Sequence, residues 1–219
     1  MLKDWLDALL ALVFPQRCPV CRQWADSHGW CQACLGRMVR ATRVAVSLHN
    51  LVYLDGCQTV VAYAGPVRRL IRDMKFRHVT RHAGRLSRLL DYGLAPDSYR
   101  RIDVVVPVPL HRQRLAERGF NQTVLIFQPW AVRRRLSWLE ALARTRATAP
   151  QWELTLKERR KNSQGAFAVT CPDLIKGKNI LLVDDIFTSG ITMNECARVL
   201  KQAGAAEVKG LALAGGPGN

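Results

Sequence analysis

Residues 181–192 read LLVDDIFTSGIT, and this stretch decides the fold. An apolar run of strand character over 178–185 ends in two acids. A hydroxyl-rich turn with one glycine then leads into an apolar-periodic helix over 191–203, which Gly204 closes. Ligands of open parallel α/β sheets bind at the carboxyl ends of the strands, where this turn stands. The stretch therefore predicts a binding loop between a buried strand and a helix.

Each part of this loop suits a phosphorylated ribose. Backbone N–H groups at a helix start hold a dianionic phosphate, and Gly190 lets the backbone approach it closely. Asp184 and Asp185 can accept hydrogen bonds from two neighbouring hydroxyls, such as the 2′ and 3′ hydroxyls of ribose. We assign ligand binding to both acids and to the loop that follows them, which comprises Thr188, Ser189, Gly190, Ile191 and Thr192.

A response-regulator receiver also carries two acids at the end of an apolar strand. In a receiver that strand is the first of the domain, whereas only 34 residues follow Asp185 here. The receiver is therefore excluded, and a ribose-phosphate loop is favoured over an acid pair in a solvated turn.

Outside this loop, alternating strand and helix patterns over 102–214 predict a parallel α/β sheet flanked by helices. Residues 102–109 read IDVVVPVP, which is typical of a central parallel strand. The other expected elements are a strand hairpin over 51–64 around Asp55-Gly56, helices over 67–76 and 81–93 with Thr80 capping the second, a helix over 120–127 that stops before Pro129, a mobile loop with one helix over 144–165, and a strand over 208–214.

Four cysteines near the start have the spacing C-x₂-C-x₉-C-x₂-C, namely Cys18, Cys21, Cys31 and Cys34. Such a set offers four thiolates to a tetrahedral zinc and leaves no open position, so we predict a structural zinc. Disulfides are the alternative, but they need an oxidising compartment, and nothing in the sequence directs export. Cys57, Cys171 and Cys196 are isolated and are expected to be small buried residues.

The first residues, Met1–Phe14, resemble a signal peptide, but Asp4 and Asp7 interrupt the apolar run and no small-residue cleavage site follows. We expect an amphipathic helix there and a soluble, cytoplasmic protein. The expected division is an N-terminal helix over 1–14, a zinc-binding knuckle over 15–50 and a ligand-binding domain over 51–219.

Basic side chains are concentrated outside the ligand loop. Residues 1–160 carry 27 basic and 12 acidic side chains, whereas residues 161–219 carry 6 and 5. Such an excess attracts polyanions, with nucleic acid the first candidate and an anionic membrane the second. Trp24, Trp30 and Phe76 could stack on unpaired bases or could belong to the core. We assign nucleic-acid binding to Arg68, Arg72, Lys75, Arg81, Arg85 and Arg88.

The order of motifs resembles the ComF family of competence-associated, phosphoribosyltransferase-like proteins, over about residues 15–214. The knuckle is followed by IRDMKF at 71–76, VPVPL at 106–110 and RGFNQ at 118–122. RTR then stands at 144–146, before Gln151, Leu154, Arg159, Asn162, Ala166 and Phe167 and the 181–192 loop. Ser189 stands where the family usually has threonine, and Ile191 where it has a small residue.

The resemblance implies a type I phosphoribosyltransferase fold with a small N-terminal zinc knuckle of four cysteines. It implies binding of 5-phosphoribosyl-1-pyrophosphate with Mg²⁺, a role in DNA uptake, and association with single-stranded DNA and a helicase-like partner. In that family the loop after the 102–109 strand binds pyrophosphate, which adds Val108, Pro109, His111 and Arg112 to the ligand site.

Two functions stay open at this point. In a transferase of nucleobase or nucleotide salvage, Asp184 and Asp185 would be catalytic, holding the ribose while positive charge develops at its anomeric carbon. In a binding module, the same site would sense the ribose phosphate without turnover, while the basic surface engages DNA. The acceptor and a general base are not identifiable from the sequence.

Overall fold

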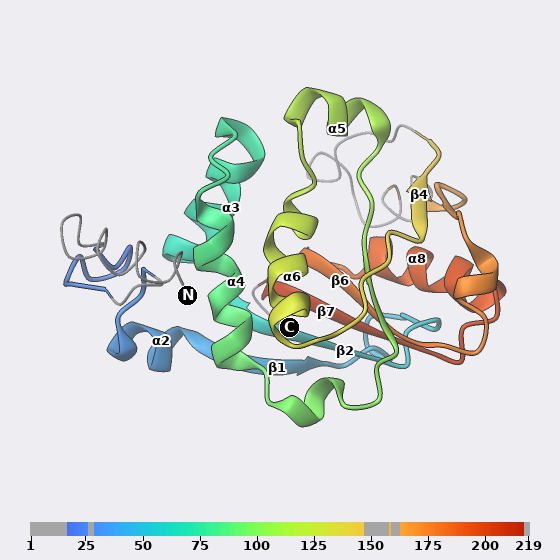
Figure 1. Cartoon of the computed structure of the whole chain (residues 1–219), viewed down its shortest axis with the longest axis horizontal. Helices are drawn as coiled ribbons and strands as arrows, with labels where there is room; N and C mark the ends of the chain where they lie inside the picture. Colours follow the sequence, from blue (N-terminus) through green and yellow to red (C-terminus); the bar gives the residue numbers. More distant parts are fainter. Residues whose placement is uncertain (1–16, 26–28, 147–157, 159–162, 217–219) are drawn as a thin grey trace.

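The computed structural model describes residues 17–25, 29–146, 158 and 163–216 (Figure 1). A five-stranded sheet has the order β1-β2-β7-β6-β3, in which only β1 is antiparallel to its neighbour. The strands, in that order, are Val39–Val44, Gly56–Ala62, Glu207–Gly215, Asn179–Phe187 and Val104–Pro107. The parallel strands end at one edge, which is where the ligand loop was predicted.

Helices cover both faces of this sheet (Figure 1). One core lies under α3 (Gly65–Arg77), α4 (His82–Gly93) and α6 (Gln122–Arg133), and a second lies under α8 (Ile191–Gln202). The shorter elements are α2 (Gln32–Met38), α5 (Arg112–Arg118), the 3-10 turns Pro96–Tyr99 and Pro172–Leu174, and the paired strands β4 (Leu142–Arg144) and β5 (Phe167–Val169). The predicted helices over 67–76, 81–93 and 191–203 and strands over 178–185 and 208–214 are confirmed within a few residues.

The predicted hairpin over 51–64 is wrong. Residues 51–55 form turns, and the partner of β2 is β1, in antiparallel register with Val44 opposite Cys57. Strand β1 reads VRATRV and is mostly exposed, so it lacks the apolar alternation that reveals a strand. This edge strand lies within the stretch expected to form the zinc knuckle.

Two further expectations are corrected around β3 and α6. Strand β3 is the last of the sheet rather than central, yet it is buried because the chain at 137–139 bonds to Val105 along its outer edge. Helix α6 runs through Pro129 to Arg133. An interior proline costs about 3 kcal/mol, but Ile126 and Phe127 before it and Trp130 and Ala131 after it are buried in the core and hold the helix together.

The cap predicted for α4 is also wrong. Arg81 rather than Thr80 is the N-cap residue, and no side chain caps the helix. Thr80 takes part through its backbone, because its carbonyl accepts the Ala83 N–H at 2.9 Å. The expected N-terminal helix over 1–14, and most of the expected loop over 144–165, lie outside the described residues. Within the described ranges, no helix combines the length and apolar character needed to span a bilayer.

Candidate functional site

The two acids lie at the end of β6, where three elements converge on them. Asp185 is buried, and its Oδ2 lies 2.6 Å from the Nζ of Lys75 on α3. The Oδ1 of Asp184 accepts hydrogen bonds from the Thr123 hydroxyl of α6, at 3.3 Å, and from the Asp185 N–H, at 2.8 Å. The strand therefore presents adjacent carboxylates that neighbouring helices hold in place.

The electrostatics of this pair are unusual for surface acids. Burial raises the pKa of Asp184 to about 8, with a further contribution from the charge of Asp185. Burial also lowers the pKa of the Arg118 guanidinium, and the negative charge of Asp185 acts in the opposite direction. Burial likewise lowers the pKa of the Arg144 guanidinium, and the charge of Asp184 offsets part of that effect. Lys75, Arg118 and Arg144 thus surround two acids with three cations, an arrangement suited to a ligand that carries hydroxyls and several phosphate charges.

The RGFNQ segment connects this pair to the loop after β3. The Asn121 side chain donates to the Val108 carbonyl at 3.0 Å and accepts the Thr123 N–H at 3.0 Å, which caps α6. Arg118 donates to the Gln122 side chain, and the Phe120 ring packs edge-on against His78 at the end of α3. The segment thereby fixes Thr123 and Arg118 beside the acids.

The predicted phosphate loop has the geometry of a close backbone approach. Gly190 has φ of +71° and starts α8. A Cβ there would lie 2.6 Å from Leu51 and 2.8 Å from the Phe187 ring, so both conformation and space require glycine. Thr188 is exposed at the turn, while Ser189, Ile191 and Thr192 are partly buried. The first turn of α8 supplies the N–H groups that an anion needs.

The loop after β3 is more constrained than the resemblance implied. The Val108 N–H donates to the Val183 carbonyl at 2.9 Å, and Pro109 has no N–H, so neither can give a backbone N–H to an anion. His111 caps α5, with Nδ1 accepting the Gln113 N–H at 3.3 Å, and Arg112 is exposed. The cations beside the acid pair instead come from Arg118 and from Arg144, whose strand bridges His111.

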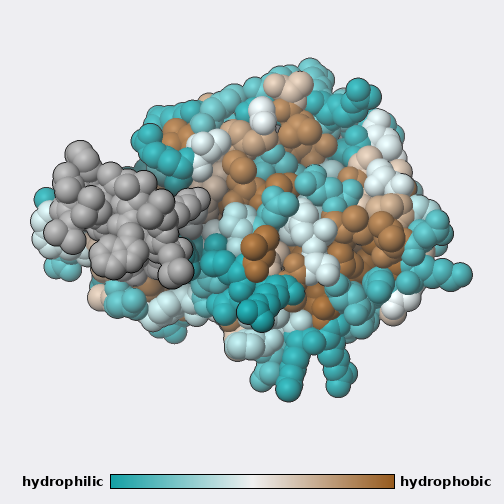
Figure 2. All heavy atoms as spheres, viewed as in Figure 1, coloured by the Kyte–Doolittle hydropathy of each residue, from teal (hydrophilic) through white to brown (hydrophobic). Residues whose placement is uncertain are grey.

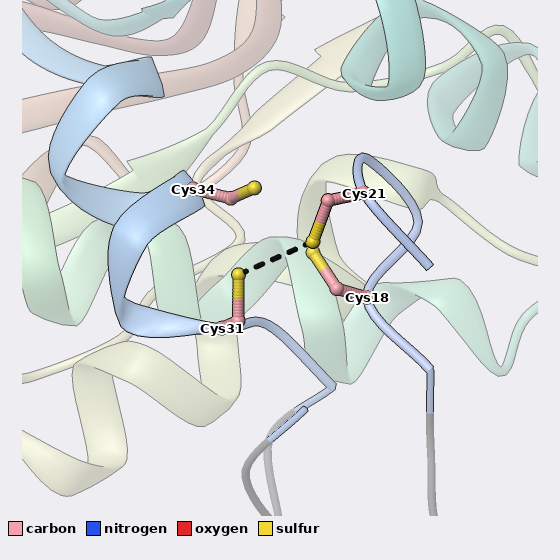
Figure 3. Close-up of side chains that lie close together, drawn as sticks. All are labelled: Cys18, Cys21, Cys31 and Cys34. Atoms are coloured by element: carbon pink, nitrogen blue, oxygen red, sulfur yellow. Dashed lines mark hydrogen bonds between the residues drawn. The ribbon is translucent and has the colours of Figure 1, made fainter. Parts of the chain in front are cut away.

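The four cysteines of the knuckle converge on one point (Figure 3). All four sulfurs lie within 4.8 Å of one another, and those of Cys21 and Cys31 are 3.5 Å apart. The spread matches four thiolates around one zinc, with Zn–S distances of about 2.3 Å. All seven cysteines of the chain are described and none is in a disulfide, which contradicts the oxidised alternative.

The knuckle is fastened to the rest of the chain. Trp30 is fully buried, and its indole N–H donates to the Arg85 carbonyl of α4 at 2.8 Å. Trp30 therefore belongs to the core and cannot stack on a base. Helix α2, which carries Cys34, ends at Met38, and β1 begins at Val39.

Two of the three aromatic residues considered for stacking are exposed beside arginines. Trp24 is 61% exposed with Arg17 4.7 Å from its ring centre, and Phe76 is 63% exposed with Arg72 at 6.0 Å. Arg68 of α3 is also exposed. We call Arg68, Arg72 and Phe76 the outer face of α3. Figure 2 shows hydrophilic side chains interspersed with apolar ones over the visible side of the molecule.

The arginines at and on α4 that the sequence assigns to nucleic acid are less open to solvent. Arg81 is exposed, but Arg85 is partly buried, which lowers its pKa. Arg88 lies 3.6 Å from Asp91, an acid that also pairs with Arg133 and Arg134. Among the cations assigned to nucleic acid, Lys75 points to Asp185 instead.

Sequence reasoning gave Lys75, Arg118, Thr123 and Arg144 no role at the acids; their only signal was their place in or beside IRDMKF, RGFNQ and RTR.

Comparisons with known proteins agree with this geometry. Residues 140–218 match the family model "Phosphoribosyl transferase domain", and residues 9–45 match "Double zinc ribbon domain". The chain thus has the predicted phosphoribosyltransferase fold with a four-cysteine zinc ribbon.

Similar whole proteins are named for DNA utilization or competence. The chain is 38% identical to DNA utilization protein YhgH of Escherichia coli O157:H7 over 156 residues, covering 69% of this chain and 68% of that protein. It is 34% identical to the protein of that name in Salmonella typhimurium over 224 residues, covering 90% and 96%. It is 28% identical to Competence protein F of Haemophilus influenzae over 210 residues, covering 90% and 89%.

Proposed function

Because the chain belongs to the ComF family of competence and DNA-utilization proteins, we propose that it binds 5-phosphoribosyl-1-pyrophosphate with Mg²⁺ and acts on incoming single-stranded DNA. The observation that carries the ligand is the Asp184–Asp185 pair, in which Asp185 is buried against Lys75 and which the Gly190 loop follows. We place the protein in the cytoplasm, where thiols stay reduced for zinc.

Each part of the ligand has a counterpart at the end of β6. The carboxylates accept hydrogen bonds from the ribose hydroxyls, and the first turn of α8 holds the 5′-phosphate. Arg118 and Arg144, whose charges act on the two acids, would bind the pyrophosphate. Mg²⁺ usually keeps few protein ligands and binds through substrate phosphates, so a site with two acids fits it. When bound, the metal neutralises phosphate charge.

Calorimetric titration with 5-phosphoribosyl-1-pyrophosphate and Mg²⁺ tests this assignment. We expect Asp185→Ala to lower the affinity by about tenfold to a hundredfold, because a hydrogen bond to a charged group contributes about 1.5–3 kcal/mol. Asp184→Ala should have a similar effect and leave the fold intact. Asp97→Ala, at an exposed acid paired with Arg100, is the control. Unchanged affinity in the double variant at 184 and 185 would refute the site.

Turnover is a separate question with a separate assay. The surrounding cations could stabilise departing pyrophosphate, which favours a transferase of nucleobase or nucleotide salvage as the second candidate. Release of pyrophosphate in the presence of a nucleobase or single-stranded DNA would establish that activity. Tight binding without release, in every acceptor mixture, would identify a sensor.

The outer face of α3 and the Trp24 surface support the proposal for DNA. Exposed arginines beside exposed rings combine phosphate contacts with base stacking, which suits unpaired strands of any sequence. A helicase-like partner would act on the same strand. Micromolar binding of single strands of mixed sequence, in preference to duplexes of equal length, is the expected result.

A further inference from the structure

The basic side chains of helix α3 have two kinds of surroundings, which the sequence pattern does not distinguish. Its buried positions, Val67, Leu70, Ile71 and Met74, hold it firmly against the core. Phe76 is directed to solvent, whereas the neighbouring Lys75 is only 21% exposed and reaches Asp185 at 2.6 Å. Lys75 stands seven residues after Arg68 and three after Arg72, at the border between the outer face and the buried face of α3, and its side chain is turned from solvent to Asp185.

The acid pair needs a cation in this position. Adjacent buried carboxylates repel each other, and each loses hydration, so the ionised state of both is costly. Asp185 is faced by Lys75 of α3 and Arg118 of α5, and Asp184 by Thr123 of α6, Arg144 of β4 and the buried Cys196 of α8. Among these cations, Lys75 makes the direct contact with a carboxylate oxygen.

The contact also selects one oxygen of the carboxylate. Lys75 Nζ lies at Oδ2 of Asp185, and a carboxylate has a second oxygen with lone pairs of its own. We propose that Lys75 is a positioning residue of the ribose-phosphate site, which fixes the Asp185 carboxylate through Oδ2 and leaves Oδ1 to accept a ribose hydroxyl. This inference rests on the proposed ligand and gives Lys75 no part in DNA binding.

A matched ion pair exists elsewhere in the chain. Lys201 Nζ lies 2.7 Å from Oδ2 of Asp55, and the lysine side chain is 26% exposed. That pair ties α8 to the turn before β2, away from the acid pair. Lys201→Met therefore removes the same charge from a pair of nearly the same length, in which the lysine is similarly exposed and the acid is more exposed, and it controls for any general effect of losing a lysine.

The experiment titrates the full-length, zinc-bound protein with two probes, 5-phosphoribosyl-1-pyrophosphate with Mg²⁺ and ribose 5-phosphate. We expect Lys75→Met to weaken both probes by about tenfold or more, and by similar factors, because the loss acts through Asp185 on the ribose. Lys75→Arg should recover most of the affinity, since it keeps the charge. Lys201→Met should bind both probes as the unaltered protein does. Lys75→Gln replaces Lys75→Met if the methionine variant does not fold.

A parallel titration with single-stranded DNA separates the role of Lys75 from that of the outer face of α3. Lys75→Met should leave DNA affinity within about twofold, whereas Arg72→Gln should weaken DNA binding and spare both ribose probes. The inference is overturned if Lys75→Met binds both probes normally, if only the pyrophosphate-bearing probe weakens, or if only DNA binding falls. Failure of the unaltered protein to bind either probe would instead overturn the proposed ligand, and this assignment with it.

Discussion

The acid pair at the end of β6 and the outer face of α3 use charge in opposite ways. At the acid pair, unlike charges are buried together, with Lys75 and Asp185 at 2.6 Å. On the outer face, Arg68 and Arg72 are exposed beside Phe76. Buried charges with fixed partners discriminate the geometry of one small ligand, while exposed charges of one sign attract any polyanion. Under the proposed function, α3 would contribute Lys75 to a specific site and its outer face to a tolerant one.

The largest effect is expected at the zinc knuckle, which lies outside both of these regions. We expect Cys31→Ser to lower the zinc content and to reduce the free energy of unfolding by several kcal/mol, because zinc binding stabilises a knuckle with little core of its own. Metal analysis and thermal unfolding measure both effects. Cys171→Ser, outside the cluster, should retain one zinc per chain. A purified protein without zinc, with disulfides among the four cysteines, would contradict the prediction.

Gly190→Ala tests the specific site alone. The added Cβ would clash with Leu51 and Phe187 at a φ of +71°, so we expect at least about tenfold weaker binding of the phosphoribosyl ligand and a loss of about 1–3 kcal/mol in stability. Gly177→Ala is the matched control, since φ is +73° there and nothing lies within 4 Å of the added atom. DNA binding should persist in both variants. Equal ligand affinity in the two would show that the loop does not approach the phosphate.

Salt titrations of DNA affinity sharpen the description of the tolerant site. If Arg68 and Arg72 contact phosphates, replacing both by Gln should flatten the log–log salt slope by about 1.4, at about 0.7 per contact for single strands. Replacing Arg81, Arg85 and Arg88 by Gln should flatten it less, by about 0.7. The reason is that Arg85 is partly buried and Arg88 is already paired with Asp91. The reverse order would place the strand on α4.

Asp184→Asn should produce the smallest change, and it is a gain in stability. The folded protein raises the pKa of Asp184 from 3.8 to about 8, so folding holds a proton that the unfolded chain releases. Stability conferred by this group is therefore lost as the pH rises from about 4 to about 8. We therefore expect the variant to gain stability relative to the unaltered protein as the pH rises toward 8. Urea unfolding at pH 5 and pH 8 would refute this if the difference did not grow with pH.

Local motifs were predictable from the sequence, and contacts between distant segments were not. The four cysteines and the LLVDDIFTSGIT stretch each carry their chemistry within a few residues. The strand and the helix predicted on either side of the LLVDDIFTSGIT turn are confirmed as β6 and α8. Lys75 looked like one more cation of a basic segment, because its approach to Asp185 depends on how α3 packs on the sheet. Strand β1 escaped notice because exposed edge residues do not alternate in hydropathy.

The direct passage from α2 into β1 has a practical consequence for shortened versions of the protein. A chain begun after the cysteines and without residues 39–44 would lose its antiparallel edge strand, and the outer backbone of β2 would then be bare. Unpaired strand edges recruit other chains, so such a truncation should precipitate or form sheet-linked oligomers. Strand β1, which follows the zinc knuckle directly, thus also protects the molecule from self-association.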